Sequence, residues 1–201
     1  MEELLEEMET YAAARHVPII RAEERDILLR LVDNCKPHAV LEIGTAIGYS
    51  ALLIASCAAP HVQVTTLELD ADRAAVADAF IRRSSFHEQI HIHVGDAAVL
   101  LPRLTGTYDF VFIDAAKGQY VDYFHKVLPL LAKNAVIAAD NVLFRGYVRC
   151  DEKPPRRYKT IVKRLREYIT LVNSTPGFVT EIHEDGDGLA ISRRLNYVEK
   201  T

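Results

Sequence analysis

The sequence contains no tryptophan, only two methionines and only three cysteines among its 201 residues. Cys35, Cys57 and Cys150 are odd in number, far apart and outside any Cys-x-x-Cys pattern, so neither a disulfide framework nor a zinc knuckle is indicated. No apolar run is long enough to cross a bilayer, and the Glu-rich segment 1–9 lacks the basic start and apolar stretch of a secretory signal. We therefore expect a soluble, cytoplasmic protein that does not enter a membrane.

The composition fits one globular domain. Hydrophobic residues make up 49% of the chain and charged residues 26%, which supplies a real core without calling for a second full domain. We expect a single domain over residues 1–201, with N-terminal helices in 1–38 and an α/β core in 39–201. The net charge of -4 argues against a protein coated in positive charge, yet arginine and lysine crowd residues 145–166.

Apolar, β-branched runs alternate with helical patterns from residue 39 onward. The runs predict strands at 39–43, 62–68, 90–94, 109–113 and 135–139, and the helical patterns fall at 49–58, 71–83 and 119–131. Continuous apolar strands joined by helices predict an α/β fold with a doubly wound, mostly parallel sheet. Two further runs, 178–183 and 188–193, predict an antiparallel C-terminal hairpin at one edge, which gives seven strands. Residues 2–15 and 22–34 predict two helices before the sheet.

A strand, a glycine turn and a helix start follow one another in residues 40–50. Ligands of open α/β sheets bind outside the carboxyl ends of the strands, where Gly44 and Gly48 permit close approach to the backbone. About 20 residues later Glu68 ends the second strand, where a carboxylate can accept hydrogen bonds from ribose hydroxyls. The spacing lacks the third glycine of the dinucleotide fingerprint, and Glu42 would repel a pyrophosphate. The pattern therefore favours an adenosine with another tail over NAD.

Asp96 follows the third strand and is placed to accept a hydrogen bond from the adenine amino group. A lone glycine pair after a strand is often only a tight turn, and Asp96 alone could be a helix N-cap. The joint placement of Glu42, Glu68 and Asp96 at one sheet edge favours the nucleoside site.

Oxygen-bearing side chains also end the next two strands. Asp114 follows the fourth strand, and Asp140 and Asn141 follow the fifth, so these three converge on the same edge. Hard oxygen ligands suit Mg²⁺, Mn²⁺ or Ca²⁺ rather than zinc. Lys117 can lie beside a metal-bound hydroxyl and act as general base. The alternatives are a turn at Asp140 and Asn141, an N-cap at Asp114 and a solvated Lys117.

At these residues the sequence resembles the small, metal-dependent class I O-methyltransferases, which include catechol and caffeoyl-coenzyme A methyltransferases. The resemblance runs from about residue 16 to 194, and its specific parts are 41–50, 111–117 and 140–143. It implies a Rossmann-like class I methyltransferase fold, S-adenosylmethionine as cofactor, a Mg²⁺ or other divalent cation on Asp114, Asp140 and Asn141, and catalytic roles for Lys117 and Asp114. The cofactor contacts that it implies are Val17, Glu42, Gly44, Thr45, Gly48, Tyr49, Ser50, Glu68, Leu69, Asp96, Ala97 and Asp114.

Segments 16–19, 114–120, 140–146 and 186–192 resemble the bacterial tRNA 5-hydroxyuridine methyltransferases more closely. This resemblance implies a methoxyuridine product at the anticodon wobble position, and the family leads us to expect a homodimer. Because the chain has no tryptophan, any aromatic wall around the substrate must be built otherwise, for which Phe144, Tyr147 and Tyr120 are candidates.

The basic segment follows directly from the proposed metal ligands. We interpret Arg145, Arg156, Arg157 and Lys163 as contacts to the phosphates of a tRNA anticodon stem-loop whose splayed base enters the site. The competing interpretation is an amphipathic helix over 158–168 with a solvated basic face.

Three other functions stay open on the sequence. The first is methylation of a catechol-like small molecule. A non-catalytic nucleotide-binding module is the second, against which the complete set of Asp114, Lys117, Asp140 and Asn141 argues. An NAD-dependent oxidoreductase is the third, and the missing glycine disfavours it.

Overall fold

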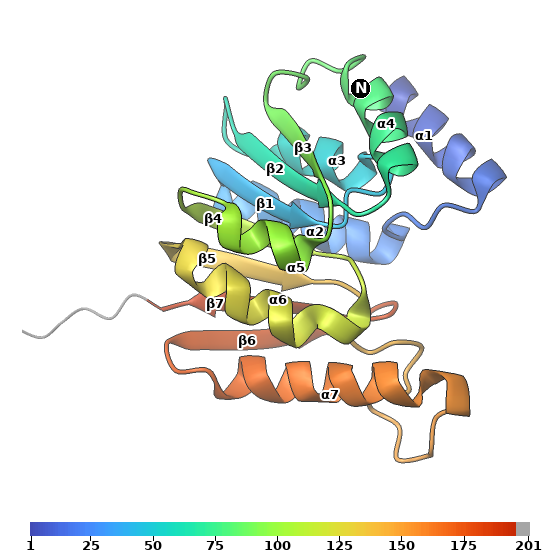
Figure 1. Cartoon of the computed structure of the whole chain (residues 1–201), viewed down its shortest axis with the longest axis vertical. Helices are drawn as coiled ribbons and strands as arrows, with labels where there is room; N and C mark the ends of the chain where they lie inside the picture. The colour runs from blue at the N-terminus through green and yellow to red at the C-terminus, as the bar shows by residue number, and fades with distance from the viewer. Residues whose placement is uncertain (196–201) are drawn as a thin grey trace, which may run out of the picture.

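The computed structural model describes residues 1–195, and residues 196–201 of the expected domain lie outside the described residues. One seven-stranded sheet runs through the chain in the order β3-β2-β1-β4-β5-β7-β6 (Figure 1). The strands are β1 (Ala39–Ile43), β2 (Gln63–Glu68), β3 (Ile90–Val94), β4 (Tyr108–Ile113), β5 (Leu131–Ala139), β6 (Phe178–His183) and β7 (Leu189–Arg194). Strands β1 to β5 are parallel, and β7 pairs antiparallel with both β5 and β6. The predicted mostly parallel sheet with a C-terminal hairpin is confirmed.

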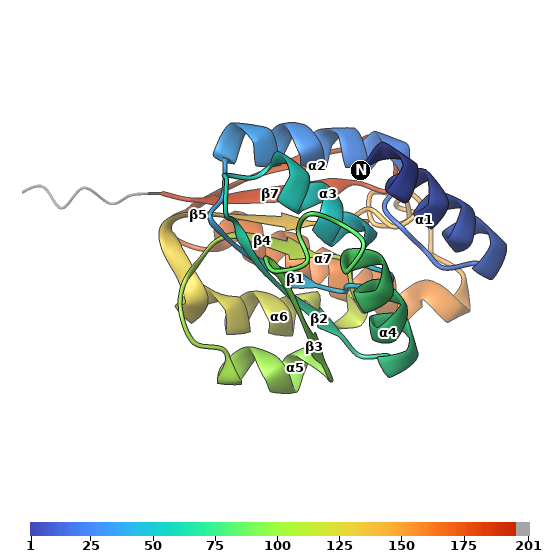
Figure 2. The ribbon, with the colours of Figure 1, turned by 90° about the horizontal axis from the view of Figure 1, so that it is seen from above.

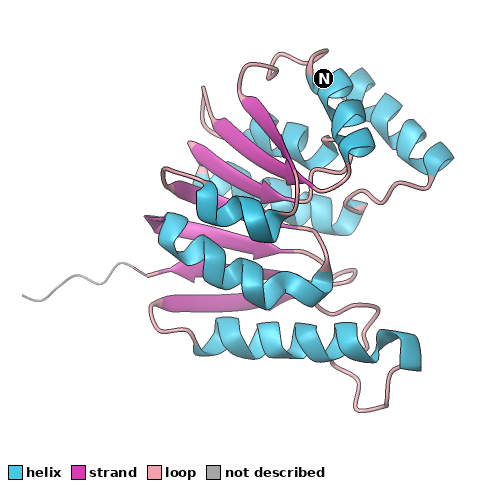
Figure 3. Cartoon of the chain, viewed as in Figure 1, coloured by secondary structure: helices cyan, strands magenta, loops and turns pink. Residues whose placement is uncertain are grey.

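Helices cover both faces of this sheet (Figures 2 and 3), with α2 and α3 on one face and α5 and α6 on the other. The helices are α1 (Glu2–Arg15), α2 (Ala22–Cys35), α3 (Tyr49–Cys57), α4 (Ala71–Ile81), α5 (Ala97–Leu100), α6 (Tyr120–Val127) and α7 (Lys159–Ser174). Short 3-10 turns are η1 (Leu101–Arg103), η2 (Lys117–Gln119), η3 (Leu128–Leu130) and η4 (Arg156–Tyr158). Within residues 1–195, no helix has both the length and the apolar character needed to span a membrane.

Three boundaries differ from the sequence prediction by more than two residues. Helix α6 ends at Val127, where η3 with its proline leads directly into β5. That strand begins at Leu131 rather than at residue 135, because Leu131 already pairs with Tyr108 of β4. Helix α7 continues past residue 168 to Ser174, since Val172 extends its buried stripe by another turn. The short helix α5 was not predicted.

The strands divide their side chains between two cores. Alternate residues of the central strands, such as Val40 and Phe110, pack with α2 and α3, whereas their neighbours Leu41 and Val111 pack with α6 and α7. Alternation of this kind is the period of a strand, and burial on both faces explains the continuous apolar runs. Glu42 occupies the next even position after Val40, and no part of it is exposed. The fold therefore buries a carboxyl group directly beneath the glycine turn.

The backbone hydrogen bonds of the sheet continue past the strand ends. The amide of Asp114 donates to the Ile43 carbonyl at 2.9 Å, and the amide of Asp140 donates to the Ile113 carbonyl at the same distance. This extension places the residues that follow β1, β4 and β5 side by side at the carboxyl edge.

Candidate active site

A cavity of about 530 Å³ lies at the carboxyl ends of β1 to β5. Its lining includes most of the residues that the sequence predicted: Gly44, Thr45, Tyr49, Ser50, Glu68, Leu69, Asp96, Ala97, Asp114, Lys117, Asp140 and Asn141. Glu42, Gly48 and Val17 are outside this lining, and so are the four predicted RNA contacts. The predicted nucleoside half and the predicted reacting half of the site thus share one cavity.

The two glycines of the β1–α3 turn are explained by packing. A Cβ on Gly44, whose φ is +107°, would lie 2.0 Å from the carbonyl oxygen of Asp114. A Cβ on Gly48, whose φ is +84°, would contact Ile81 and Ala77 of α4 at 3.2 and 3.3 Å. Both positions need glycine because the turn lies against β4 and α4, a reason that the sequence analysis did not give.

Glu42 lies beneath the glycine turn with one oxygen unpartnered. Its Oε2 accepts a hydrogen bond from the Thr66 hydroxyl at 2.5 Å, and Thr66 is also 2.6 Å from the Thr45 hydroxyl. Burial raises the pKa of Glu42 to about 7, and the negative charges of Asp114 and Glu68 add to the rise. Among the described residues, its buried Oε1 accepts no hydrogen bond of ordinary geometry, although the nearby hydroxyls of Ser50 and Thr66 oppose the rise of the pKa. Because Glu42 is fully buried and outside the cavity lining, this carboxyl group lies beneath the cavity wall rather than on it.

Glu68 is held rigidly at the end of β2. Its Oε2 accepts from the Ala46 amide at 2.7 Å and its Oε1 from the Asp70 amide at 2.9 Å. Each carboxylate oxygen keeps a further lone pair, so a role as acceptor for ribose hydroxyls is compatible with these bonds. These two hydrogen bonds from backbone amides fix the orientation of the carboxylate before any ligand binds.

Asp96 and Tyr123 lie on opposite elements of the same part of the cavity wall. Asp96 is the N-cap of α5 and accepts from the Ala98 amide at 2.8 Å, so the capping interpretation holds, although the residue also lines the cavity. Burial raises the pKa of Tyr123 to about 12, the negative charge of Asp96 adds to the rise, and both side chains line the cavity. Sequence reasoning missed Tyr123, because its position on α6 looks like any core position of an amphipathic helix.

The link between α1 and α2 forms another wall of the cavity, where the sequence predicted only one contact, Val17. Residues 18–21 line the cavity, whereas Val17 lies in a neighbouring cavity of about 420 Å³ with Glu9 and His16. The Tyr49 hydroxyl, on the main cavity's side, donates to the Glu9 carboxylate, and Arg25 donates to Glu9 at 3.1 Å and to the Tyr49 oxygen at 3.2 Å. These bonds tie α1 to the cavity wall.

The predicted reacting residues lie together. Lys117 Nζ donates to Asp114 Oδ1 at 2.8 Å, and both side chains are partly buried. Asp140 is 1% exposed, and its Oδ1 accepts from the Asn141 amide at 2.8 Å. Burial raises the pKa of Asp140 to about 7, and the negative charge of Asp114 adds to the rise.

A divalent cation fits this donor set. Two carboxylates and one amide side chain line the same wall, and oxygen donors of this kind suit a divalent cation. In residues 1–195 no group of three or more His, Cys, Asp or Glu side chains is placed to hold a metal. The set here would use the Asn141 amide as its third donor, as the sequence predicted.

Tyr120 does not form a substrate wall, contrary to the sequence-based suggestion. It is fully buried, and its hydroxyl donates to the carbonyls of Ile113 and Asp140 at 3.2 and 3.0 Å. It therefore braces the ends of β4 and β5. The other two candidates, Phe144 and Tyr147, are partly exposed and pack on the ring of Tyr158 with centroid separations of 5.2 and 5.8 Å.

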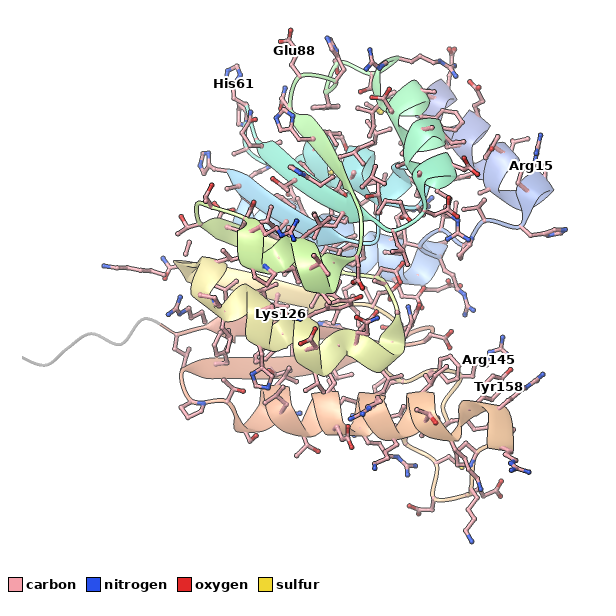
Figure 4. All side chains as sticks on the ribbon, in the orientation of Figure 1. Arg15, His61, Glu88, Lys126, Arg145 and Tyr158 are labelled. Atoms are coloured by element: carbon pink, nitrogen blue, oxygen red, sulfur yellow. The ribbon has the colours of Figure 1, made fainter. Side chains whose placement is uncertain are left out.

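The basic residues divide into two groups. Arg145, Arg156 and Arg157 are exposed, and no carboxylate within the described residues lies within 4.0 Å of them. The guanidinium groups of Arg145 and Arg157 lie over the Tyr158 ring, with their carbons 5.6 and 4.6 Å from its centroid. Figure 4 shows Arg145 beside Tyr158. Lys163 differs, since it lies 3.8 Å from the Glu167 carboxylate on α7. Helix α7 packs against η2, which carries Lys117, so this basic surface adjoins the reacting residues.

Comparison with known proteins identifies the family. A family described as O-methyltransferase matches residues 1–195. The chain belongs to the O-methyltransferase family. A catechol O-methyltransferase of Niastella koreensis is 38% identical to this O-methyltransferase over 122 residues, which is 59% of the chain but only 55% of the relative.

Two solved structures share the whole fold of this O-methyltransferase. A Staphylococcus aureus protein with a provisional description as a caffeoyl-CoA O-methyltransferase is 32% identical, with a TM-score of 0.87 over 94% of this chain and 91% of that one. A Bacillus cereus O-methyltransferase in complex with SAH is 27% identical, with a TM-score of 0.83 over 96% and 90% of the two chains. The predicted class I methyltransferase fold is confirmed by these matches.

Proposed function

We propose that this O-methyltransferase transfers a methyl group from S-adenosylmethionine to a hydroxyl that Asp114, Lys117, Asp140 and Asn141 receive. The observation that carries the proposal is the single cavity in which these four side chains face a nucleoside-type half built by Glu68 and Asp96. The complex of the Bacillus cereus relative with SAH, the demethylated form of this cofactor, supports the choice.

The described residues can position the reactants and remove a proton. Glu68 would hold the ribose, and Asp96 with Tyr123 would flank the adenine. Lys117, once unprotonated, would accept the proton of the attacking hydroxyl as the oxygen–methyl bond forms and the sulfur–methyl bond breaks. Asp114, Asp140 and Asn141 would hold Mg²⁺ or a related cation, which supplies polarisation of the substrate oxygen. The main catalytic contribution of such a site is to align the hydroxyl with the methyl group.

For the substrate we propose 5-hydroxyuridine at the wobble position of a tRNA anticodon loop. Its two adjacent ring oxygens resemble those of a catechol and suit the same donor set. Arg145, Arg156 and Arg157 are exposed and have no carboxylate partner within residues 1–195, which supports a substrate that carries phosphates beside the reacting base. We infer a smaller part for Lys163, because Glu167 already lies near it.

A catechol-like small molecule is the second candidate. The match to the Niastella koreensis catechol O-methyltransferase favours it. Coenzyme A esters also carry phosphates, so the same arginines would contact the phosphates of coenzyme A in a caffeoyl-CoA-type substrate. The basic surface alone therefore does not separate an RNA from such an ester.

Methyl transfer from labelled S-adenosylmethionine tests these alternatives in one experiment. The acceptors are tRNA lacking wobble methoxyuridine, catechol and caffeoyl-CoA, each with Mg²⁺ and with a chelator. Label in tRNA that disappears with chelator supports the primary proposal. Label confined to catechol or to caffeoyl-CoA overturns the RNA substrate but retains the reaction, and no label in any acceptor contradicts both.

A further inference from the structure

The segment that follows Asn141 is attached to the turn between β6 and β7. Asp187, in that turn, accepts the Arg145 amide on its Oδ1 at 2.9 Å and the Leu143 amide on its carbonyl at 2.8 Å. The neighbouring Gly188 carbonyl accepts the Val142 amide at 3.0 Å. Three hydrogen bonds to one short turn thus hold the backbone directly after the proposed metal ligands.

This backbone is in a conformation that needs support. Asn141, Phe144 and Arg145 have φ values of +55°, +42° and +56°, which are unfavourable for residues with side chains. A residue in this conformation is strained, and the conformation persists only where the surrounding structure determines it. The contacts with the β6–β7 turn are the surroundings that do so here.

Helix α2 supports the turn from the other side. Glu24 is completely buried, and its Oε1 accepts the Asp187 amide at 2.7 Å. Arg21, one turn earlier, lies 3.2 Å from Asp187 Oδ2. The other carboxylate oxygen of Glu24, Oε2, has no hydrogen-bond partner among residues 1–195. Burying a carboxyl group in this way is costly, so a packing role alone would be better served by an apolar residue.

Two glycines show how tightly the turn is enclosed. A Cβ on Gly186, at φ +63°, would lie 2.1 Å from Glu24 Oε1. On the opposite side, a Cβ on Gly188, at φ +86°, would lie 2.4 Å from Leu143 Cγ. Asp187 is therefore clamped between α2 and the segment 142–145, with no room for a side chain on either neighbour.

We propose that Glu24 and Asp187 are positioning residues of the reacting centre, which act by fixing the backbone of residues 141–145. As a consequence, Asn141 is held in place beside Asp140, and Arg145 is held in place on the basic surface beside Tyr158. This inference rests on the proposed function for the role of those residues, but the backbone clamp itself does not depend on any substrate.

Amide hydrogen exchange of the whole chain, measured by NMR, tests the clamp without an activity assay. In the wild-type protein the Arg145 amide should be protected although its side chain is exposed. Asp187→Ala should speed its exchange at least tenfold, while the amide of Val111 in β4 stays protected. Asp187→Asn should restore protection, because its side-chain oxygen still accepts. Glu24→Ala should expose the Asp187 amide, and Glu24→Gln should keep it protected.

Binding of Mn²⁺ alone, measured by calorimetry, tests the consequence. Asp187→Ala and Glu24→Ala should weaken it about tenfold, the lower end of effects seen for residues that orient metal ligands. The exposed neighbours provide matched controls, since Asp185→Ala and Glu23→Ala should leave binding and exchange unchanged.

Several results would overturn the clamp: an unprotected Arg145 amide in the wild-type protein, equal exchange in Asp187→Ala and wild type, or no rescue by Asp187→Asn. If the alanine variants do not fold, the wild-type protection and the two conservative variants still decide. If the wild-type chain binds no Mn²⁺, the proposed metal role fails, whereas the exchange data still decide the clamp.

Discussion

Lys117 and Asp114 form an ion pair of 2.8 Å inside the cavity, with side chains that are 17% and 28% exposed. A second lysine, Lys126, pairs with Asp122 on α6 at 2.6 Å, with 28% and 47% exposure. The two pairs are chemically alike and similarly spaced in the sequence. Only the first lines the cavity, which separates a reacting role from an ordinary helix ion pair.

Replacing Lys117 by methionine should therefore reduce methyl transfer by about 10²- to 10⁴-fold, the range for loss of a general base. S-adenosylmethionine affinity, measured by calorimetry, should change less than twofold, because Lys117 is placed for the acceptor hydroxyl. Lys126→Met removes the same charge from a similar pair and should keep near-wild-type activity. Retention of more than half the activity in Lys117→Met would contradict the base role.

Asp140→Asn should strongly reduce cation-dependent activity while the protein stays folded. The substitution keeps the shape of the side chain but removes a charge that is already costly to bury, so we expect no loss of thermal stability near pH 8. Mn²⁺ binding and methyl transfer should both fall at least tenfold, whereas cofactor binding persists. Asp122→Asn is the exposed control. Equal wild-type activity with and without chelator would refute the metal role.

The sequence was sufficient for those features that depend on strand ends. Asp114 and Asp140 each follow an apolar strand, and parallel strands bring their carboxyl ends to one edge, so their convergence could be predicted. The sequence also allowed the prediction that Lys163, unlike Arg156, has a carboxylate partner, since Glu167 lies four residues after Lys163.

Features that depend on distant packing could not be predicted. Tyr120 looked like an available aromatic residue, but its ring packs edge-on against Tyr168 of α7 at 5.4 Å and is removed from the cavity. Glu24 contacts Asp187, which is 163 residues away in the sequence, and no periodicity marks such a pair. In both cases the role follows from which elements meet across the fold rather than from a local pattern.

Stability of the cofactor-free protein should fall as the pH rises through the range set by Glu42. The unfolded chain loses this proton near pH 4.5, whereas burial raises the folded-state pKa to about 7. The folded state holds more protons in between, so Glu42 alone should lower the free energy of unfolding by about 3 kcal/mol from pH 4.5 to 7, with no further change from this group above that range. Urea unfolding at a series of pH values measures this.

Glu42→Gln should flatten that decrease. The variant cannot lose a proton at this position, so its stability relative to wild type should be greater at pH 8 than at pH 5. Part of the decrease should persist, because the raised pKa of Asp140 acts in the same direction. The exposed Glu23→Gln should follow the wild-type curve. Parallel curves for wild type and Glu42→Gln would show that Glu42 titrates normally in the folded protein.

Arg156→Ala with Arg157→Ala should weaken tRNA binding and reduce the slope of log affinity against log salt concentration. Each lost phosphate contact lowers the magnitude of that slope by a little under one. Fluorescence titrations of labelled anticodon stem-loop at several salt concentrations provide the measurement. Because Arg157 stacks on Tyr158, the unfolding temperature of the variant should be recorded beside the binding data.

The matched control is Arg82→Ala with Arg83→Ala, which removes the same charge from the two residues that follow α4. These arginines already pair with Asp78 and Glu7, so the control tests whether net charge alone explains weaker binding. If both double variants lose affinity equally, the attraction is diffuse and the arginines beside Tyr158 are not specific contacts. If only the first pair loses affinity and salt dependence, the phosphates lie at η4, beside the helix that packs on the turn of Lys117. An RNA base would then be delivered where the reacting side chains converge.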